Sequence, residues 1–208
     1  MSGKGQPEGG QFIMLSARAL AGKTIGVKED FISAGERQEL LAYVRSPHAA
    51  WDKNLPPNDV WHGRKIDPPA MPDNVRTLMA DIRNRAIATI KADYGISDTV
   101  YADTLQLVRW RPGDQQAPHA DCEEPDGRPN QFPWRAFASI IYLNEDFEGG
   151  QIHFPNLFYQ PQIKAGMLTY FPSSAKYLHG VKPVTRGMRY THSCFYTGNK
   201  FRGDGEAF

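Results

Sequence analysis

The sequence predicts a mainly β protein, in which an antiparallel double-sheet jelly roll follows a shorter helical region. Two observations predict this fold class. Apolar residues recur at helical spacing up to about residue 95, and from Val100 onward short apolar segments alternate with glycine and proline breaks. Helices first and many short strands afterwards favour a double sheet with the helices packed on one of its faces.

Domain organisation follows from the length and from this change of pattern. Residues 1–10 are mostly glycine, polar and charged residues and are predicted to form a flexible tail. The remainder, 11–208, is long enough for a single domain with its own core. Within it we expect a helical support over about 28–99 and the jelly-roll core over about 100–200, preceded by a first strand or two in 12–27.

Two helices are predicted before the strands of the jelly-roll core. Ser33-Ala34-Gly35-Glu36 is a capping box, which satisfies free backbone N–H groups at a helix start, and it predicts a helix over 34–46. Asp73 is predicted to cap a second helix over 74–94, whose apolar residues recur at i, i+3, i+4 and i+7. Gly95 stands where the C-terminal cap is expected. The second helix should therefore pack one apolar face on a sheet and take no part in catalysis.

The jelly-roll core is predicted from short segments of strand-forming residues. Glycine- and proline-containing pairs such as Pro112-Gly113 and Arg186-Gly187 separate them. The expected strands are 103–110, 117–123, 136–143, 150–154, 163–171, 177–184 and 188–197.

Charge and hydropathy disfavour several classes of protein. The net charge of +1, with both signs interspersed, offers no electrostatic footprint for nucleic acid or an anionic membrane. No apolar run approaches the roughly 18 residues of a membrane helix, and the first residues lack the apolar core of a secretory signal. The two cysteines, Cys122 and Cys194, are too few for a disulfide framework. We therefore expect a cytoplasmic protein without a nucleic-acid or membrane partner.

The chemistry is predicted around Pro118-His119-Ala120-Asp121. Alternation along a strand would place His119 and Asp121 on one side of it. His179 follows in another apolar segment, where Gly180 would let the backbone pass close to the site. Two imidazoles and one carboxylate can occupy one face of an octahedral metal and leave three positions open. The alternative is a surface H-x-D triplet with an unrelated histidine, which the strand context and a following arginine disfavour.

That arginine is Arg189, at the start of the last predicted strand. A dicarboxylate cosubstrate that binds a metal at one end needs its far carboxylate neutralised, and arginine does this with two parallel hydrogen bonds. Alternation puts Thr191 on the same face as Arg189 and turns His192 away. Tyr142 ends an inward-facing strand and could add a hydrogen bond to that carboxylate, although a core tyrosine is the alternative. Lys164 is the next candidate for the carboxylate anchor.

At these residues the chain resembles the iron(II)- and 2-oxoglutarate-dependent dioxygenases, and among them the prolyl hydroxylases. The most specific likeness is to the catalytic domains of prolyl 3-hydroxylases, over about the last 110 residues. The resemblance implies a double-stranded β-helix, the cupin-like form of the jelly roll. The segments that carry it are PHAD at 118–121, IIYLNEDFEGGQIHF at 140–154 and LHGVKPVTRGMRY at 178–190.

The resemblance also implies cofactors and roles. Fe(II), 2-oxoglutarate and O2 would be used, with ascorbate in support, to hydroxylate an unactivated C–H of a prolyl residue or proline-like substrate. The implied iron ligands are His119, Asp121 and His179. Arg189 would pair with the 5-carboxylate of 2-oxoglutarate, with Tyr142 assisting and Trp110 standing where the family often has a tyrosine.

Other interpretations remain open at this level. The substrate could be a peptide or protein, or instead a free amino acid or small natural product, because pocket shape comes from loops. The same jelly roll can also hold a zinc or manganese ion for hydrolysis or isomerisation, or can merely bind a ligand. A nucleic-acid demethylase is disfavoured, since such relatives carry a second arginine where this chain has Phe195. The oligomeric state is not predicted.

Substrate contacts are predicted on two long irregular segments, 47–72 and 122–135. Long loops beside a catalytic site commonly order over the substrate and exclude water, although plain solvated connections are the alternative. The candidate contacts are Trp61 and Arg64 in the first segment and Arg128 and Trp134 in the second.

Overall fold

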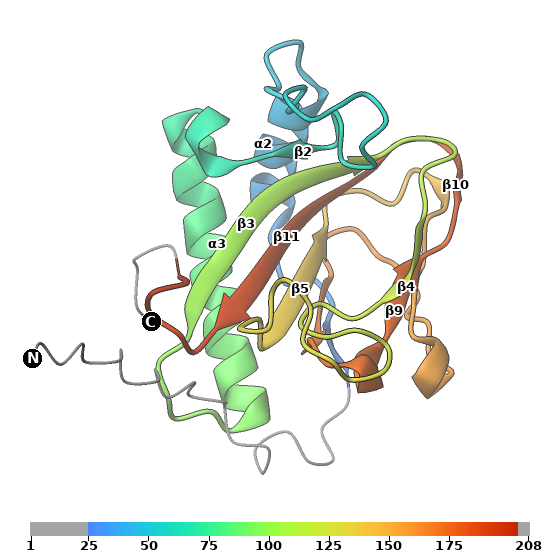
Figure 1. Ribbon diagram of the computed structural model, residues 1–208. Coiled ribbons are helices and arrows are strands. Elements are labelled where there is room, and N and C mark those ends of the chain that lie inside the picture. Colours follow the sequence, from blue (N-terminus) through green and yellow to red (C-terminus); the bar gives the residue numbers. More distant parts are fainter. Residues whose placement is uncertain (1–24, 204–208) are drawn as a thin grey trace, which may run out of the picture.

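The computed structural model describes residues 25–203, and a long, strongly twisted antiparallel sheet dominates it (Figure 1). The six strands of this large sheet run in the order β1-β8-β5-β11-β3-β2. Their bounds are β1 (Gly26–Lys28), β2 (Lys65–Ile66), β3 (Tyr101–Trp110), β5 (Phe137–Tyr142), β8 (Leu168–Pro172) and β11 (Arg189–Thr197).

Two smaller sheets form the second layer, and Figure 1 shows β4, β9 and β10 facing the long strands β3 and β11. One has the order β4-β9-β7 and the other pairs β10 with β6. Their bounds are β4 (Gln116–His119), β6 (Glu148–Gly149), β7 (Ile152–His153), β9 (His179–Val181) and β10 (Val184–Arg186). Two opposed antiparallel layers with helices outside one of them confirm the predicted jelly-roll class.

The helices α2 (Ala34–Arg45) and α3 (Asp73–Tyr94) cover the outer face of the large sheet. The main core lies between them and that sheet. It joins helix residues such as Leu40, Met79 and Ile82 to strand residues such as Leu107 and Ile141, all of them buried. Three short 3-10 helices complete the described elements: η1 (Pro68–Ala70), η2 (Pro155–Leu157) and η3 (Ala175–Tyr177).

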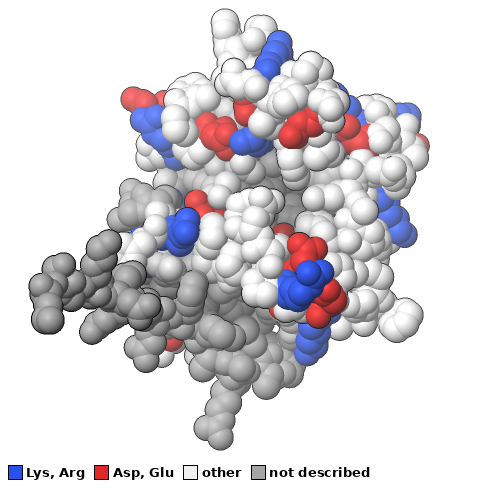
Figure 2. Space-filling model, in the orientation of Figure 1, with Lys and Arg blue, Asp and Glu red and all other residues white. Residues whose placement is uncertain are grey.

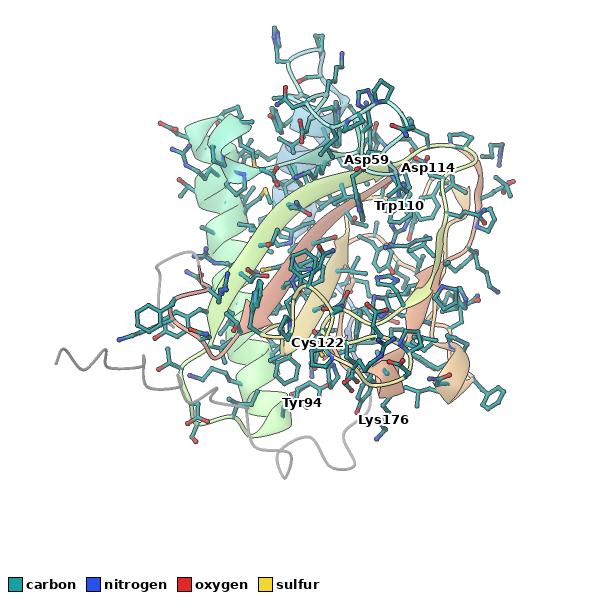
Figure 3. The ribbon with its side chains drawn as sticks, viewed as in Figure 1. Asp59, Tyr94, Trp110, Asp114, Cys122 and Lys176 are labelled. Carbon is teal, nitrogen blue, oxygen red and sulfur yellow. The ribbon has the colours of Figure 1, made fainter. Side chains whose placement is uncertain are left out.

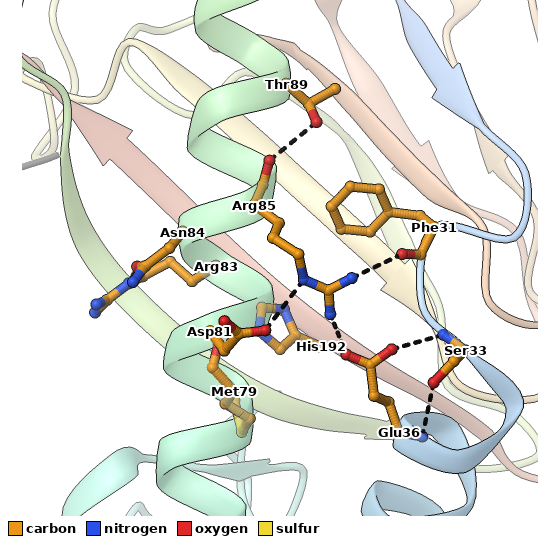
Figure 4. A network of polar contacts seen from close by, with 10 residues as sticks. All are labelled: Phe31, Ser33, Glu36, Met79, Asp81, Arg83, Asn84, Arg85, Thr89 and His192. Carbon is orange, nitrogen blue, oxygen red and sulfur yellow. Dashed lines mark hydrogen bonds and ion pairs between the residues drawn. The ribbon is translucent and has the colours of Figure 1, made fainter.

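A polar network ties the start of α2 to α3 (Figure 4). The predicted capping box is confirmed: the Ser33 hydroxyl accepts from Glu36 N, and the Glu36 carboxylate accepts from Ser33 N at 2.7 Å. Arg85 of α3 pairs with that same Glu36 and also donates to the Phe31 carbonyl at 3.2 Å. The cap of α3 was wrongly predicted, because Pro72 occupies the N-cap position and Asp73 is already helical. Gly95 ends α3 with φ 65°, as expected of a left-handed C-cap.

Several strand boundaries differ from the prediction for local reasons. The strand expected over 117–123 ends at His119, and the one over 163–171 begins only at Leu168, after a turn in which Gly166 has φ 86°. Pro183 lacks an N–H, and the segment 177–184 accordingly divides into β9 and β10. Similarly, 150–154 contains only the short β7.

Opposite faces of β11 meet different environments. Tyr190, Cys194 and Tyr196 belong to the core under the helices, whereas Arg189, Thr191, Ser193 and Phe195 line a cavity on the other face. None of the described helices is long and apolar enough to cross a membrane. The predicted tail at 1–10 lies outside the described residues, as does all of the expected first strand region except its end, where β1 begins.

Candidate active site

A cavity of about 490 Å³ lies between the large sheet and the β4-β9-β7 sheet. Side chains from β3, β5 and β11 form one wall, and those from β4 and β9 form the other. Residues from the 47–72 and 122–135 segments line the remaining sides, and the volume is ordinary for a site that binds small molecules. The predicted residues His119, Asp121, His179, Arg189, Trp110, Thr191 and Trp61 all line this cavity.

His119, Asp121 and His179 come together inside the cavity. Each offers one ligand atom, and these atoms all lie within 4.8 Å of one another. The Asp121 carboxylate stands between the two imidazoles, with Oδ1 3.6 Å from His119 Nε2 and Oδ2 3.7 Å from His179 Nε2. Asp121 Oδ2 is buried and has no hydrogen-bond partner within the described residues, which leaves it free for a cation.

Backbone geometry delivers the three ligands in two ways. His119 and His179 are directly opposed partners in the antiparallel pairing of β4 with β9. Asp121 lies beyond the end of β4, so strand alternation does not place it, contrary to the prediction. Its N–H instead donates to the Ser173 carbonyl at 2.9 Å, just after β8. The carboxylate is therefore held by the large sheet, and the histidines by the small one.

Close packing of β4 and β9 depends on Gly180. An added Cβ there would lie 2.8 Å from the Gln116 carbonyl oxygen and 3.0 Å from Pro118 N. Only a residue without a side chain lets the two histidine-bearing strands approach this closely, as the sequence suggested.

Both imidazoles are oriented by their own backbone. His119 Nδ1 lies 3.1 Å from the Ala117 carbonyl oxygen, and His179 Nδ1 lies 3.1 Å from that of Tyr177. With the proton on Nδ1 donated to a carbonyl, Nε2 carries the lone pair in each ring. The two Nε2 atoms are the ones that face Asp121.

Electrostatics give Asp121 and His179 the protonation states that a divalent metal requires. Burial lowers the pKa of His179 to about 4, although the Asp121 charge opposes this effect. Burial would raise the pKa of Asp121, but its two histidine neighbours and Arg135 reverse the sign and the net pKa is lowered. Burial would also lower the pKa of His119, but its interactions with Asp121 reverse the sign and the net pKa is raised. At neutral pH Asp121 is a carboxylate and His179 a neutral base, as metal ligands must be.

A second group of unpaired polar atoms belongs to Arg189 and Tyr142. Both side chains are almost completely buried, and the Arg189 guanidinium lies 5.0 Å from the Tyr142 ring centre. Arg189 Nε and Nη2 and the Tyr142 hydroxyl have no hydrogen-bond partner within the described residues. A buried arginine without a carboxylate is energetically unfavourable, so this cluster favours an anionic ligand. Tyr142 lies next to Arg189 but does not itself line the cavity.

Gly150 makes room for the Arg189 side chain. A Cβ at this position, where φ is +66°, would lie 3.1 Å from Arg189 Cδ and 2.9 Å from a Val184 methyl group. The alternative anchor, Lys164, is about half exposed, pairs with Glu29 at 2.8 Å and does not line the cavity.

The predicted substrate contacts separate into two groups. Trp61 lines the cavity, whereas Arg64, Arg128 and Trp134 do not. Arg64 is buried against tryptophan rings, and Arg128 points to solvent and pairs with Asp126. The ring of Trp134 packs edge-on against Phe132. These three side chains therefore do not face the cavity, and the sequence pattern did not indicate this.

Arg135 lines the cavity, although it is not among the four candidate substrate contacts predicted from the sequence. Its guanidinium lies between the rings of Phe132 and Phe195, 3.9 and 3.8 Å from their centres. It also donates to Asp103 at 2.7 Å. A bulge where β3 meets β11 turns Asp103 toward this arginine. The only sequence signal was an arginine in a loop beside a metal motif.

These features define a class of protein. Residues 105–197 match the model of the 2OG-Fe(II) oxygenase superfamily. That segment contains the triad, Arg189 and the strands that hold them, and it is similar to the proteins of that superfamily. Proteins of this superfamily use Fe(II), 2-oxoglutarate and O2. Three nitrogen and oxygen ligands on one side of a cavity fit Fe(II), and the unpaired Arg189 fits a carboxylate of 2-oxoglutarate.

Within the superfamily, the similarity falls on the prolyl hydroxylase branch. Prolyl 3-hydroxylase 2 of Rattus norvegicus is 27% identical over 141 residues, which cover 58% of this chain and 20% of the relative. This chain therefore spans about a fifth of the length of that relative.

Two solved structures share the fold. The viral collagen prolyl hydroxylase of Paramecium Bursaria Chlorella virus-1 has a TM-score of 0.65 and 17% identity, covering 85% of this chain and 96% of that chain. The Trichoplax adhaerens prolyl hydroxylase, solved with a peptide fragment of hypoxia inducible factor, has a TM-score of 0.66 and 18% identity and covers 89% and 88%. At these identities the likeness concerns the fold, the double-stranded β-helix.

Proposed function

We propose that this chain hydroxylates a prolyl residue within a peptide or protein, using Fe(II), 2-oxoglutarate and O2. One observation carries the proposal: a metal-ligand triad and an unpaired buried arginine face the same cavity. A hydrolase or isomerase would need the metal site but would leave Arg189 and Tyr142 without a purpose. The prolyl hydroxylase relatives support the choice of substrate.

The protein's own residues account for binding and orientation. His119, Asp121 and His179 would hold Fe(II), which when bound supplies the activation of O2 needed to hydroxylate an unactivated C–H. Arg189 would neutralise the far carboxylate of 2-oxoglutarate, and Tyr142, whose ring centre lies 5.0 Å from that guanidinium, would assist it. Apolar residues such as Phe171 and Ile140 line the same cavity and would limit the access of water.

Charge pairing around the cavity favours a peptide over a free amino acid. Three lining residues are cationic: Lys65, Arg135 and Arg189. Lys65 pairs with Asp67 at 2.8 Å and Arg135 with Asp103 at 2.7 Å, so among the described cationic lining residues only Arg189 has no carboxylate partner. With Arg189 taken by 2-oxoglutarate, the carboxylate of a free amino acid would meet no uncompensated cation. A peptide carbonyl needs only a hydrogen-bond donor, which the paired Arg135 still offers.

Other lining groups suit an extended backbone. Amide and hydroxyl side chains that line the cavity, including Gln106, Asn130, Gln131 and Ser193, can donate to or accept from peptide groups. Phe132 and Trp61 offer aromatic surface to a proline ring. On the face drawn in Figure 2, acidic and basic side chains are interspersed, so no single charge sign would select the peptide.

The test is succinate release from 2-oxoglutarate by the Fe(II)-loaded protein. We expect prolyl peptides to stimulate release above the rate without substrate, and mass spectrometry to show a gain of one oxygen on proline. Free proline should stimulate it far less. Stimulation by free amino acids alone would move the substrate to that class, and absence of any 2-oxoglutarate turnover with every substrate would contradict the oxygenase proposal itself.

A further inference from the structure

Arg64 is a buried cation that the proposed reaction does not use. The residue is 1% exposed and lies within the 47–72 segment, just before β2. The guanidinium carbon lies 3.9 Å from the centre of the Trp110 ring and 5.0 Å from that of Trp61. The guanidinium carbon of Arg189 lies 5.2 Å from the centre of the same Trp110 ring. Two buried guanidinium groups therefore share one indole.

The charge of Arg64 is incompletely balanced. Nη1 donates to the Val60 carbonyl at 2.9 Å, but Nε and Nη2 have no hydrogen-bond partner within the described residues. The nearest carboxylate is Asp114, 3.5 Å from Nε. Asp114 is shared with Arg111, which approaches it at 3.2 Å. Figure 3 shows Asp114 and Trp110 close together at the end of β3.

Packing alone does not require a cation here. An uncharged side chain of similar length would fill the space between two tryptophans without the desolvation that burying a guanidinium entails. Burial lowers the pKa of Arg64 to about 10; Asp114 opposes this, and the nearby cations Arg111 and Arg189 add to it. Burial and the neighbouring cations thus make the positive charge of Arg64 unfavourable at this place. An anion bound nearby would make it less unfavourable.

We propose that Arg64 is a positioning residue for the cosubstrate site, a second cation that stands behind Trp110 and strengthens the attraction of Arg189 for the far carboxylate of 2-oxoglutarate. Arg64 does not line the cavity, so it acts through the electric field and through its contact with Trp110. Asp114 partly neutralises it and so limits the effect. The inference rests on the proposed use of 2-oxoglutarate.

The experiment measures 2-oxoglutarate affinity by calorimetry on Mn(II)-loaded protein, which avoids turnover. Arg64→Met should weaken binding by roughly three- to twentyfold, because charges in a buried site interact strongly. Arg64→Lys should keep most of the affinity because the charge remains. Asp114→Asn should bind 2-oxoglutarate more tightly than the wild type, because it removes the negative charge that offsets Arg64.

Arg64→Met should weaken 2-oxoglutarate binding and Asp114→Asn should strengthen it. These opposite changes distinguish an electrostatic effect of Arg64 from a packing defect. A purely structural role predicts that all three variants weaken binding together, and that result would overturn the proposal, as would unchanged affinity in Arg64→Met. If Arg64→Met does not fold, the direction of the Asp114→Asn effect alone decides. Oxalate, which lacks the far carboxylate, should be less affected in every variant.

Arg45→Met is the matched control. Arg45 also lies over an aromatic ring, 5.8 Å from the centre of Tyr190, but it pairs with Asp146 at the surface. Its 2-oxoglutarate affinity should equal that of the wild type. If the wild type itself does not bind 2-oxoglutarate, the proposed function fails. If it binds, but Arg64→Met does not weaken binding and Asp114→Asn does not strengthen it, only the role of Arg64 fails.

Discussion

His119 on β4 is the direct cross-strand partner of His179 on β9, and the centres of their rings lie 4.5 Å apart. The pair is thus fixed by backbone hydrogen bonding between two strands, while Asp121 reaches it from a loop attached to the large sheet. A metal ion bound by all three would link the two layers of the fold.

Removing any one ligand should therefore abolish turnover and weaken metal binding. His119→Ala, Asp121→Ala and His179→Ala are each expected to lose activity while keeping most of the fold. In the wild type, metal at about 100 times its dissociation constant should stabilise the protein by about 2.7 kcal/mol. Thermal melts with and without Fe(II) or Mn(II) test this, and full activity in any variant would remove that residue from the triad.

Arg189→Ala should raise the 2-oxoglutarate requirement by roughly 30-fold or more, because losing one partner of a buried charge pair costs about 2–5 kcal/mol. Tyr142→Phe should have a smaller effect in the same direction. The matched control is Lys164→Ala, since Lys164 lies outside the cavity and pairs with Glu29. An effect of Lys164→Ala larger than that of Arg189→Ala would relocate the carboxylate anchor.

Gly180→Ala should reduce metal affinity by roughly 10- to 100-fold, the range seen when groups that support metal ligands are changed. The added Cβ would force β9 away from the Gln116 carbonyl of β4. Metal titration followed by calorimetry measures the loss. Gly35→Ala is the control, because the atom nearest to its added Cβ is 3.9 Å away; a Gly180→Ala protein with wild-type metal affinity would show that strand spacing does not set the site.

Acid should destabilise the protein partly through His192, which is buried under the helices with Nε2 3.4 Å from the Met79 carbonyl oxygen (Figure 4). Burial lowers its pKa from 6.5 to about 4. Because the folded-state pKa is depressed, the unfolded chain binds the proton more readily. The stabilisation is complete above about pH 6.5 and is lost as the pH falls toward 4.

The variant His192→Gln isolates this contribution. Its stability should vary less with pH between 6.5 and 4 than that of the wild type, by about 3 kcal/mol. Urea unfolding of both metal-free proteins across this range measures it. Parallel pH profiles in the two proteins would exclude His192 as the source.

Arg135 and Arg128 offer a matched test of substrate recognition. Both follow the triad on the 122–135 segment, but Arg135 lines the cavity and Arg128 projects into solvent. Arg135→Met should raise the KM for a prolyl peptide several-fold with little change in the KM for 2-oxoglutarate, whereas Arg128→Met should leave both unchanged. Equal effects of the two substitutions would show that the 122–135 segment as a whole, and not Arg135 in particular, affects peptide binding.

Local rules predicted much of this fold. The capping box and the period of the apolar residues define α2 and α3 to within a residue or two, because helix starts and helix faces depend on near neighbours in sequence. The long strands β3, β5 and β11 were predictable for the same reason. Short strands such as β6 and β10 were not, since two or three residues carry no periodicity.

The chemistry of the site followed from residue types, but its geometry did not. His119, Asp121 and His179 could be grouped from their spacing and from the resemblance of the flanking motifs. The tether from Asp121 to Ser173 joins residues far apart in the chain, so no pattern in the sequence indicates it. The burial of Arg64 and the stacking of Arg135 likewise depend on tryptophan and phenylalanine rings supplied by other segments.

The division of β11 between two environments has a consequence for how this protein tolerates change. Arg189, Thr191, Ser193 and Phe195 meet the cavity, and the residues between them meet the helices. Single substitutions along this strand should have effects that alternate between odd-numbered and even-numbered positions. Odd positions would alter cosubstrate or substrate affinity at nearly constant melting temperature, and even positions would lower the melting temperature at nearly constant affinity. Ligand affinity and thermal stability would then be set by different residues of one strand, so that each can change without the other.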